Sequence, residues 1–166
     1  MATLTGTDFY KKFGHPGKKK FKNTLVIWDV PAELEIGFIP KRIYCHQLLM
    51  QPLGQAFRNL ITRGFVDELH TWDGCWNYRP IRGYERKYEA LMESGQEAAA
   101  IKYLSIHSWA CAIDLNAATN QLGKKPTLSK GFVKCFTDAG FEWGGTWSRP
   151  DGMHFQLASL PGESSS

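Results

Sequence analysis

The chain has 166 residues, of which 43% are apolar and 22% are charged. This length is typical of one domain with a single core, and the composition excludes an intrinsically disordered chain. No run approaches the ~20 apolar residues that a membrane-spanning helix needs, so we expect no stable membrane insertion. The net charge of +4 is modest and no nucleic-acid-binding motif accompanies the basic residues, so we expect no nucleic-acid partner.

Residues 1–22 are predicted to form a loop-rich basic arm. Gly14, Pro16 and Gly17 lie beside the run Lys18–Lys20, which is typical of a solvated loop with a weak, non-specific attraction to anionic surfaces. The polar start of the chain lacks the basic and apolar regions of a secretory signal, so we expect synthesis in a cytoplasm.

Beyond the arm, residues 23–160 are predicted to form one domain, followed by a disordered tail at residues 161–166. Apolar spacing, caps and breakers predict strands and helices in a mixed order, which favours an α+β fold built on an antiparallel sheet flanked by helices. The expected strands are 24–30, 66–72, 110–115 and 153–158, and the expected helices are 52–64, 85–100 (interrupted at Gly95) and 129–140.

The four cysteines include no Cys-x-x-Cys pair, which disfavours a structural zinc site. We expect four free thiols, mostly buried. Three of the five histidines (His15, His46 and His70) stand alone in the sequence and are interpreted as structural or surface residues.

The other two histidines have carboxylates nearby. Asp114 follows His107 by seven residues, and Asp151 precedes His154 by three. A continuous strand would separate His107 from Asp114 by ~23 Å and place them on opposite faces. One helix would leave them ~10 Å apart. A bend near 108–110, followed by a strand, lets both side chains reach one point.

Two imidazoles and one carboxylate would leave a tetrahedral zinc ion with one open position, which is typical of catalytic rather than structural zinc. Iron or manganese would also suit such ligands. Asp151 is then a candidate general base for the attacking water, with a purely structural role in the Pro150–Gly152 turn as the alternative. Arg79 is a candidate group for holding a substrate carboxylate or a developing oxyanion.

Three ordered motifs resemble a known family. The segment Ser105–Asp114 (SIHSWACAID) is similar to the Ser-x-His-x-x-Gly-x-Ala-x-Asp signature of the D-Ala-D-Ala carboxypeptidase and L-alanyl-D-glutamate endopeptidase family. The segments 143–147 (WGGTW) and 151–156 (DGMHFQ) resemble its closing elements, and 77–80 (NYRP) resembles its Tyr-Arg-Pro segment. One departure is Ala110, which stands where the signature has glycine; a positive φ there would strain an alanine.

The resemblance implies a hedgehog/DD-peptidase-like α+β domain with zinc held by His107, Asp114 and His154. It also implies a catalytic carboxylate at Asp151 and a substrate or transition-state arginine at Arg79. Ser105 and Arg82 are further candidate substrate-binding residues.

An aspartate at position 151, the small size and the polar N-terminus resemble phage endolysins of this family. We therefore expect a monomeric zinc endopeptidase that cuts peptidoglycan stem peptides after release from a host cytoplasm. The alternatives are a D-Ala-D-Ala carboxypeptidase, or a non-catalytic metal-binding module of a cell wall or virion.

Overall fold

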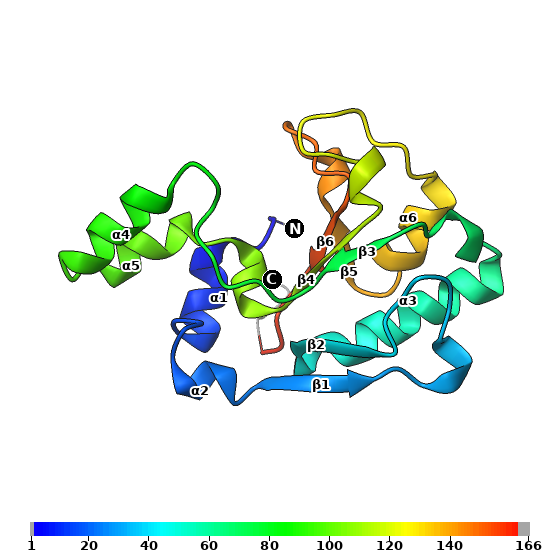
Figure 1. Cartoon of the computed structure of the whole chain (residues 1–166), viewed down its shortest axis with the longest axis horizontal. Coiled ribbons are helices and arrows are strands. Elements are labelled where there is room, and N and C mark those ends of the chain that lie inside the picture. Colours follow the sequence, from blue (N-terminus) through cyan, green and yellow to red (C-terminus); the bar gives the residue numbers. More distant parts are fainter. Residues whose placement is uncertain (1, 163–166) are drawn as a thin grey trace.

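The computed structural model describes residues 2–162, which form a small single domain of mixed α+β structure (Figure 1). A four-stranded antiparallel sheet has the order β3-β4-β6-β5, and a second, two-stranded antiparallel sheet pairs β1 with β2. The predicted fold class is thus confirmed, and the architecture is consistent with a DD-peptidase-like fold. The strands are β1 (Leu25–Asp29), β2 (Arg42–His46), β3 (Trp72–Gly74), β4 (Ala112–Leu115), β5 (Phe141–Trp143) and β6 (His154–Leu157).

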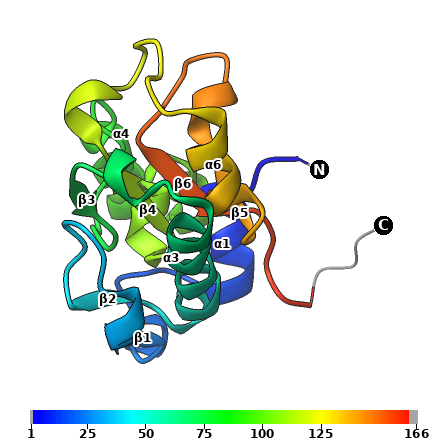
Figure 2. The same ribbon diagram turned by 90° about the vertical axis from the view of Figure 1, so that its right-hand side faces the viewer.

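Two helices, α3 and α6, cover one side of the larger sheet, as Figure 2 shows most directly. Asn59 on α3 donates a hydrogen bond to the carbonyl of Cys135 on α6 at 2.9 Å, and Phe136 on α6 packs against Phe155 on β6 with ring centroids 4.7 Å apart. The hydrogen bond joins the two helices, and the ring contact packs α6 against the sheet. The helices are α1 (Gly6–Phe13), α2 (Lys19–Lys22), α3 (Met50–Arg63), α4 (Glu85–Glu93), α5 (Glu97–Ala100) and α6 (Lys130–Thr137).

The N-terminal region differs from the predicted loop-rich arm, because it contains α1 and α2. Asp8 completes a capping box for α1 by accepting a hydrogen bond from the Thr5 N–H at 2.7 Å. Phe9 and Phe21 are buried, and Phe9 stacks on Trp109 with ring centroids 5.8 Å apart. The glycines and lysines suggested a loop, but the buried aromatic rings between them attach this region to the core.

The predicted strand 66–72 is wrong over most of its length, since Val66–Glu68 form a 3-10 turn and β3 begins only at Trp72. The side-chain oxygen of Asn116 accepts hydrogen bonds from the backbone N–H groups of His70 and Thr71 at 2.7 and 3.0 Å. Because this side chain satisfies the two donors, the segment joins no strand ladder there.

The other predicted elements are confirmed with shifted ends. The 52–64 helix is α3, which ends with Gly64 in the left-handed conformation at φ 79°. Ser129 caps α6 by accepting a hydrogen bond from the Phe132 N–H at 3.2 Å. Gly95, at φ 75°, divides the 85–100 segment into α4 and α5. Of the predicted tail, residues 163–166 lie outside the described range, and Pro161 and Gly162 form an exposed turn.

Candidate metal centre and catalytic cleft

A tight bend brings His107 next to the strand that carries Asp114. Ser105 begins a 3-10 turn over Ile106–Trp109, and its hydroxyl oxygen accepts a hydrogen bond from the His107 N–H at 3.2 Å. Ala110 then adopts the left-handed conformation at φ 56° and ψ 30°, after which the chain enters β4. The predicted bend at 108–110 is confirmed, and the position where the signature has glycine does require a positive φ.

The third residue reaches the same point through strand register. Asp114 on β4 lies directly opposite His154 on the antiparallel neighbour β6. Directly opposed residues project from the same face of a sheet, with Cβ atoms about 4.5–5.5 Å apart. The pairing therefore places this carboxylate and imidazole side by side, although they are far apart in the sequence.

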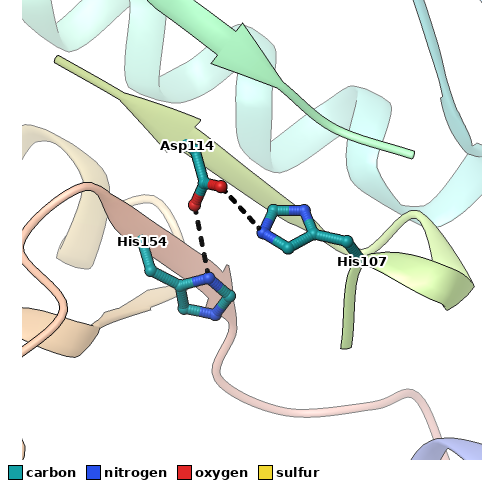
Figure 3. Close-up of side chains that lie close together, drawn as sticks. All are labelled: His107, Asp114 and His154. Carbon is teal, nitrogen blue, oxygen red and sulfur yellow. Dashed lines mark ion pairs between the residues drawn. The ribbon is translucent and has the colours of Figure 1, made fainter. Parts of the chain in front are cut away.

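The three side chains converge on one point (Figure 3). His107 Nε2 lies 3.2 Å from Asp114 Oδ2, and His154 Nδ1 lies 3.5 Å from Asp114 Oδ1. One ligand atom from each residue lies within 4.8 Å of the others. Ligand atoms on a tetrahedral ion with bonds of about 2.0–2.1 Å are about 3.3 Å apart, so the spacing suits a shared metal ion.

Hydrogen bonds on the outer side of each imidazole leave the inner nitrogen free to bind a metal. His107 Nδ1 lies 2.7 Å from the carbonyl oxygen of Cys75, and His154 Nε2 lies 2.8 Å from Gln156 Oε1. Both oxygens only accept, so both outer nitrogens carry protons. In the neutral rings His107 Nε2 and His154 Nδ1 then present lone pairs to the Asp114 carboxylate, an arrangement that a cation between them would stabilise.

The electrostatics of the group favour an ionised carboxylate. Burial raises the pKa of Asp114. In the metal-free protein, however, hydrogen bonds donated by the protonated His107 and His154 rings outweigh burial and hold the pKa below its usual range. Burial lowers the pKa of His154, yet its interaction with Asp114 leaves that pKa raised. Asp114 is therefore anionic at neutral pH and available as a ligand.

Asp151 lies on the turn that leads into β6, where its carbonyl accepts a hydrogen bond from the His154 N–H at 3.1 Å. Its N–H donates to the Gly144 carbonyl at 2.9 Å, and a Cβ on Gly144 would come within 2.7 Å of the Asp151 carbonyl oxygen. Only glycine permits this close approach. The Asp151 Oδ1 atom is buried and has no hydrogen-bond partner among the described residues. Burial is the main cause that raises the pKa of Asp151.

All the predicted site residues line one cavity of about 600 Å³. Arg79 and Arg82 line it together with Ser105, Asp151 and the metal group. The Nε of Arg79 is buried without a hydrogen-bond partner among the described residues, whereas its NH1 donates to the carbonyl of Pro80 at 3.1 Å. Arg82 is exposed at the cavity wall. The Ser105 hydroxyl oxygen already caps the turn that carries His107, which gives this residue a structural contact in addition to its place in the cavity.

Several cavity residues were not singled out from the sequence. Trp147 has a ring centroid 5.4 Å from that of His154, and its indole Nε1 is buried without a partner among residues 2–162. Arg149 and Lys102 add two more cations to the wall, and Gln156 contacts His154. Trp147 and Gln156 fall inside the motif segments 143–147 and 151–156, so the motifs could have marked them as site residues. No sequence pattern marked Lys102 or Arg149.

The histidines interpreted as structural lie outside this cavity. His15 is buried and bonds to Tyr88 and to the Gly17 N–H, His46 is buried, and His70 is exposed. The four cysteines are free and buried, as expected. Within residues 2–162, no helix has the length and apolar character needed to span a membrane.

The segment that carries the metal group also matches a known family. Residues 98–157 match a family model described as D-alanyl-D-alanine carboxypeptidase. The match covers about a third of the chain and includes Ser105, His107, Asp114, Asp151 and His154; Arg79 and Arg82 precede it. It supports a peptidase that acts on a peptide-containing substrate. Searches of curated proteins and of solved structures gave no match.

Proposed function

We propose that this protein is a zinc peptidase that cleaves the stem peptides of peptidoglycan, as an L-alanyl-D-glutamate endopeptidase of the endolysin type. One observation carries the proposal: the free nitrogens of His107 and His154 and the carboxylate of Asp114 point to one site inside a cleft that also contains Asp151. The donor set, two imidazoles and one carboxylate, is that of a catalytic zinc site with an open position.

Bound zinc would polarise the scissile carbonyl and lower the pKa of a water molecule in the site. Asp151 would take a proton from the attacking water and pass it to the leaving amine. Burial raises the pKa of Asp151 in the metal-free protein, which favours uptake of a proton by this carboxylate. Arg79, with its unpartnered Nε, would bind a substrate carboxylate or the developing oxyanion.

The charge of the cleft supports an anionic substrate. Four cationic side chains line the cavity that contains the metal group: Arg79, Arg82, Lys102 and Arg149. Stem peptides that contain D-glutamate carry free carboxylates, so the cavity and this substrate are complementary in charge. Ser105 would contribute a hydroxyl to the same wall. The enzyme would act as a monomer on the wall after release from a host cytoplasm.

A D-Ala-D-Ala carboxypeptidase is the second candidate, because the matching family model bears that description. The test is mass spectrometry of purified peptidoglycan digested by the protein with zinc, with a chelator, and with zinc restored. New amino termini at D-glutamate would support the endopeptidase. Free D-alanine with otherwise intact stems would support the carboxypeptidase. Zinc binding without any cleavage would support a non-catalytic metal-binding module and refute both peptidase activities.

The matched variants are Asp151→Asn and Asp67→Asn. Asp151→Asn removes the proposed base but not a metal ligand, so zinc binding should persist while cleavage falls by roughly 10²–10⁴-fold. Asp67 is exposed and does not line the cavity, so its variant should cleave normally. Full activity of Asp151→Asn would remove the assignment of the base.

A further inference from the structure

We propose that Gln156 is a positioning residue for His154, and that the N-terminal segment 3–5 sets the orientation of Gln156. The proposal rests on the metal site of the proposed function and names residues outside the set assigned to it. His154 and Gln156 are two residues apart on β6, so their side chains project from the same face. Gln156 is only 1% exposed, and His154 is 6% exposed.

The orientation of the Gln156 amide follows from a backbone group. Its Nε2 lies 3.0 Å from the carbonyl oxygen of Leu4, and a carbonyl oxygen can only accept a hydrogen bond. The amide nitrogen must therefore face Leu4, which turns Oε1 toward His154 at 2.8 Å. Because Oε1 also only accepts, the proton of the neutral His154 ring is held on Nε2.

This arrangement matters because Asp114 favours the opposite tautomer. In the absence of a cation, a proton on His154 Nδ1 would bond to Asp114 Oδ1, 3.5 Å away, and would block the nitrogen that faces the site. Gln156 opposes that competing state by accepting a hydrogen bond from Nε2. The Leu4 carbonyl, through Gln156, thereby keeps Nδ1 available as a metal ligand.

The N-terminal segment is fixed at several points, so its carbonyl is well placed for this role. The Leu4 side chain is 8% exposed and belongs to the core. The Thr3 hydroxyl donates to Glu142 Oε1 at 3.0 Å, and Thr5 begins α1 through its capping box with Asp8. Residues 3–6 also line the catalytic cavity. The segment is thus both a wall of the cleft and a support for one ligand.

The central variants are Gln156→Leu and Gln156→Glu. Loss of a hydrogen-bond partner of a metal-bound imidazole typically weakens metal affinity by about 10–100-fold, and we expect this for Gln156→Leu. Gln156→Glu keeps an oxygen that can accept from His154 Nε2, so its zinc affinity should stay within a few-fold of wild type or exceed it. Gln51→Leu is the matched control, because it makes the same substitution at an exposed position outside the cavity and outside the N-terminal segment.

Two measurements test the proposal. Zinc affinity is measured by competition with a chromophoric chelator, and the tautomer of His154 is read from ring ¹⁵N chemical shifts of the metal-free protein in alkaline buffer. Wild type and Gln51→Leu should show the proton on Nε2, whereas Gln156→Leu should shift the population toward Nδ1. A folded Gln156→Leu variant with wild-type tautomer and affinity would overturn the proposal.

Further outcomes separate this inference from the proposed function. If Gln156→Leu fails to fold, deletion of residues 2–4 is the second test. The deletion removes the Leu4 carbonyl, so the side-chain amide of Gln156 is free to rotate. An unchanged His154 tautomer in the deletion variant would overturn the role of the segment. If wild type binds no zinc, the proposed function fails. The ring shifts of the metal-free protein would still show whether Gln156 sets the tautomer.

Discussion

The proposed zinc site predicts that zinc raises the thermal stability of the protein through His107, Asp114 and His154. A ligand that binds only the folded state stabilises it by about 2.7 kcal/mol when its free concentration is 100 times its Kd. Unfolding entropy is roughly 2.1 cal/mol/K per residue, which gives about 0.35 kcal/mol/K for 166 residues. Zinc at that concentration should therefore raise Tm by about 8 °C over the chelated protein.

Calorimetry of the protein with chelator and with buffered zinc measures this shift. Asp114→Asn removes the only anionic ligand of the group while nearly preserving side-chain volume, so its shift should fall to a small fraction of the wild-type value. His70→Gln removes an exposed imidazole outside the cavity and should leave the shift unchanged. Equal shifts for Asp114→Asn and wild type would mean that zinc binds elsewhere and would refute our interpretation of the site.

Three further predictions concern other residues. Burial lowers the pKa of His46 from 6.5 to about 4, so the unfolded state binds more protons than the folded state between these pH values. The free energy of unfolding should therefore decline by at most about 3 kcal/mol as pH falls through this window. Urea titrations at several pH values should show a smaller decline for His46→Asn. Arg79→Lys should lower kcat/KM by roughly 10–100-fold with zinc affinity unchanged, and wild-type kinetics would exclude the arginine from substrate binding. Ala110→Val should destabilise by about 2 kcal/mol or more, because a branched side chain at φ 56° adds backbone strain and overpacking in a buried position; an unchanged midpoint of urea unfolding would contradict this.

The sequence was most informative about the candidate metal ligands, the bend beside them and the helix α3. The residue types and spacing of His107, Asp114, Asp151 and His154 allowed a metal group with a nearby carboxylate, and the resemblance of the surrounding motifs to a peptidase family predicted it. The requirement that His107 and Asp114 meet predicted the bend at 108–110. The helix α3 was predicted from its apolar spacing and the glycine that ends it. The bend and the helix depend on residues close together in the chain, so they can be deduced without tertiary contacts, whereas the metal group joins distant segments.

The N-terminal region was mispredicted because its glycines and lysines are local signals, whereas its stability comes from distant ones. Phe9 is buried against Trp109, which lies 100 positions later in the chain, and Phe21 is buried in the same core. The prediction of a strand at 66–72 was wrong for a similar reason. The side-chain oxygen of Asn116 accepts the hydrogen bonds of the His70 and Thr71 N–H groups, which a strand would donate to its neighbour. Propensity cannot anticipate such contacts.

By itself the sequence determined which side chains are available for chemistry and roughly where the chain bends. Only the tertiary structure decided how they act together, through the register that sets Asp114 opposite His154 and the carbonyls of Cys75 and Leu4 that fix the protons of the two imidazoles. The physical reason is that every residue has a backbone carbonyl. A carbonyl that orients a ligand leaves no mark in the sequence, and only the packing of distant segments brings it to the site.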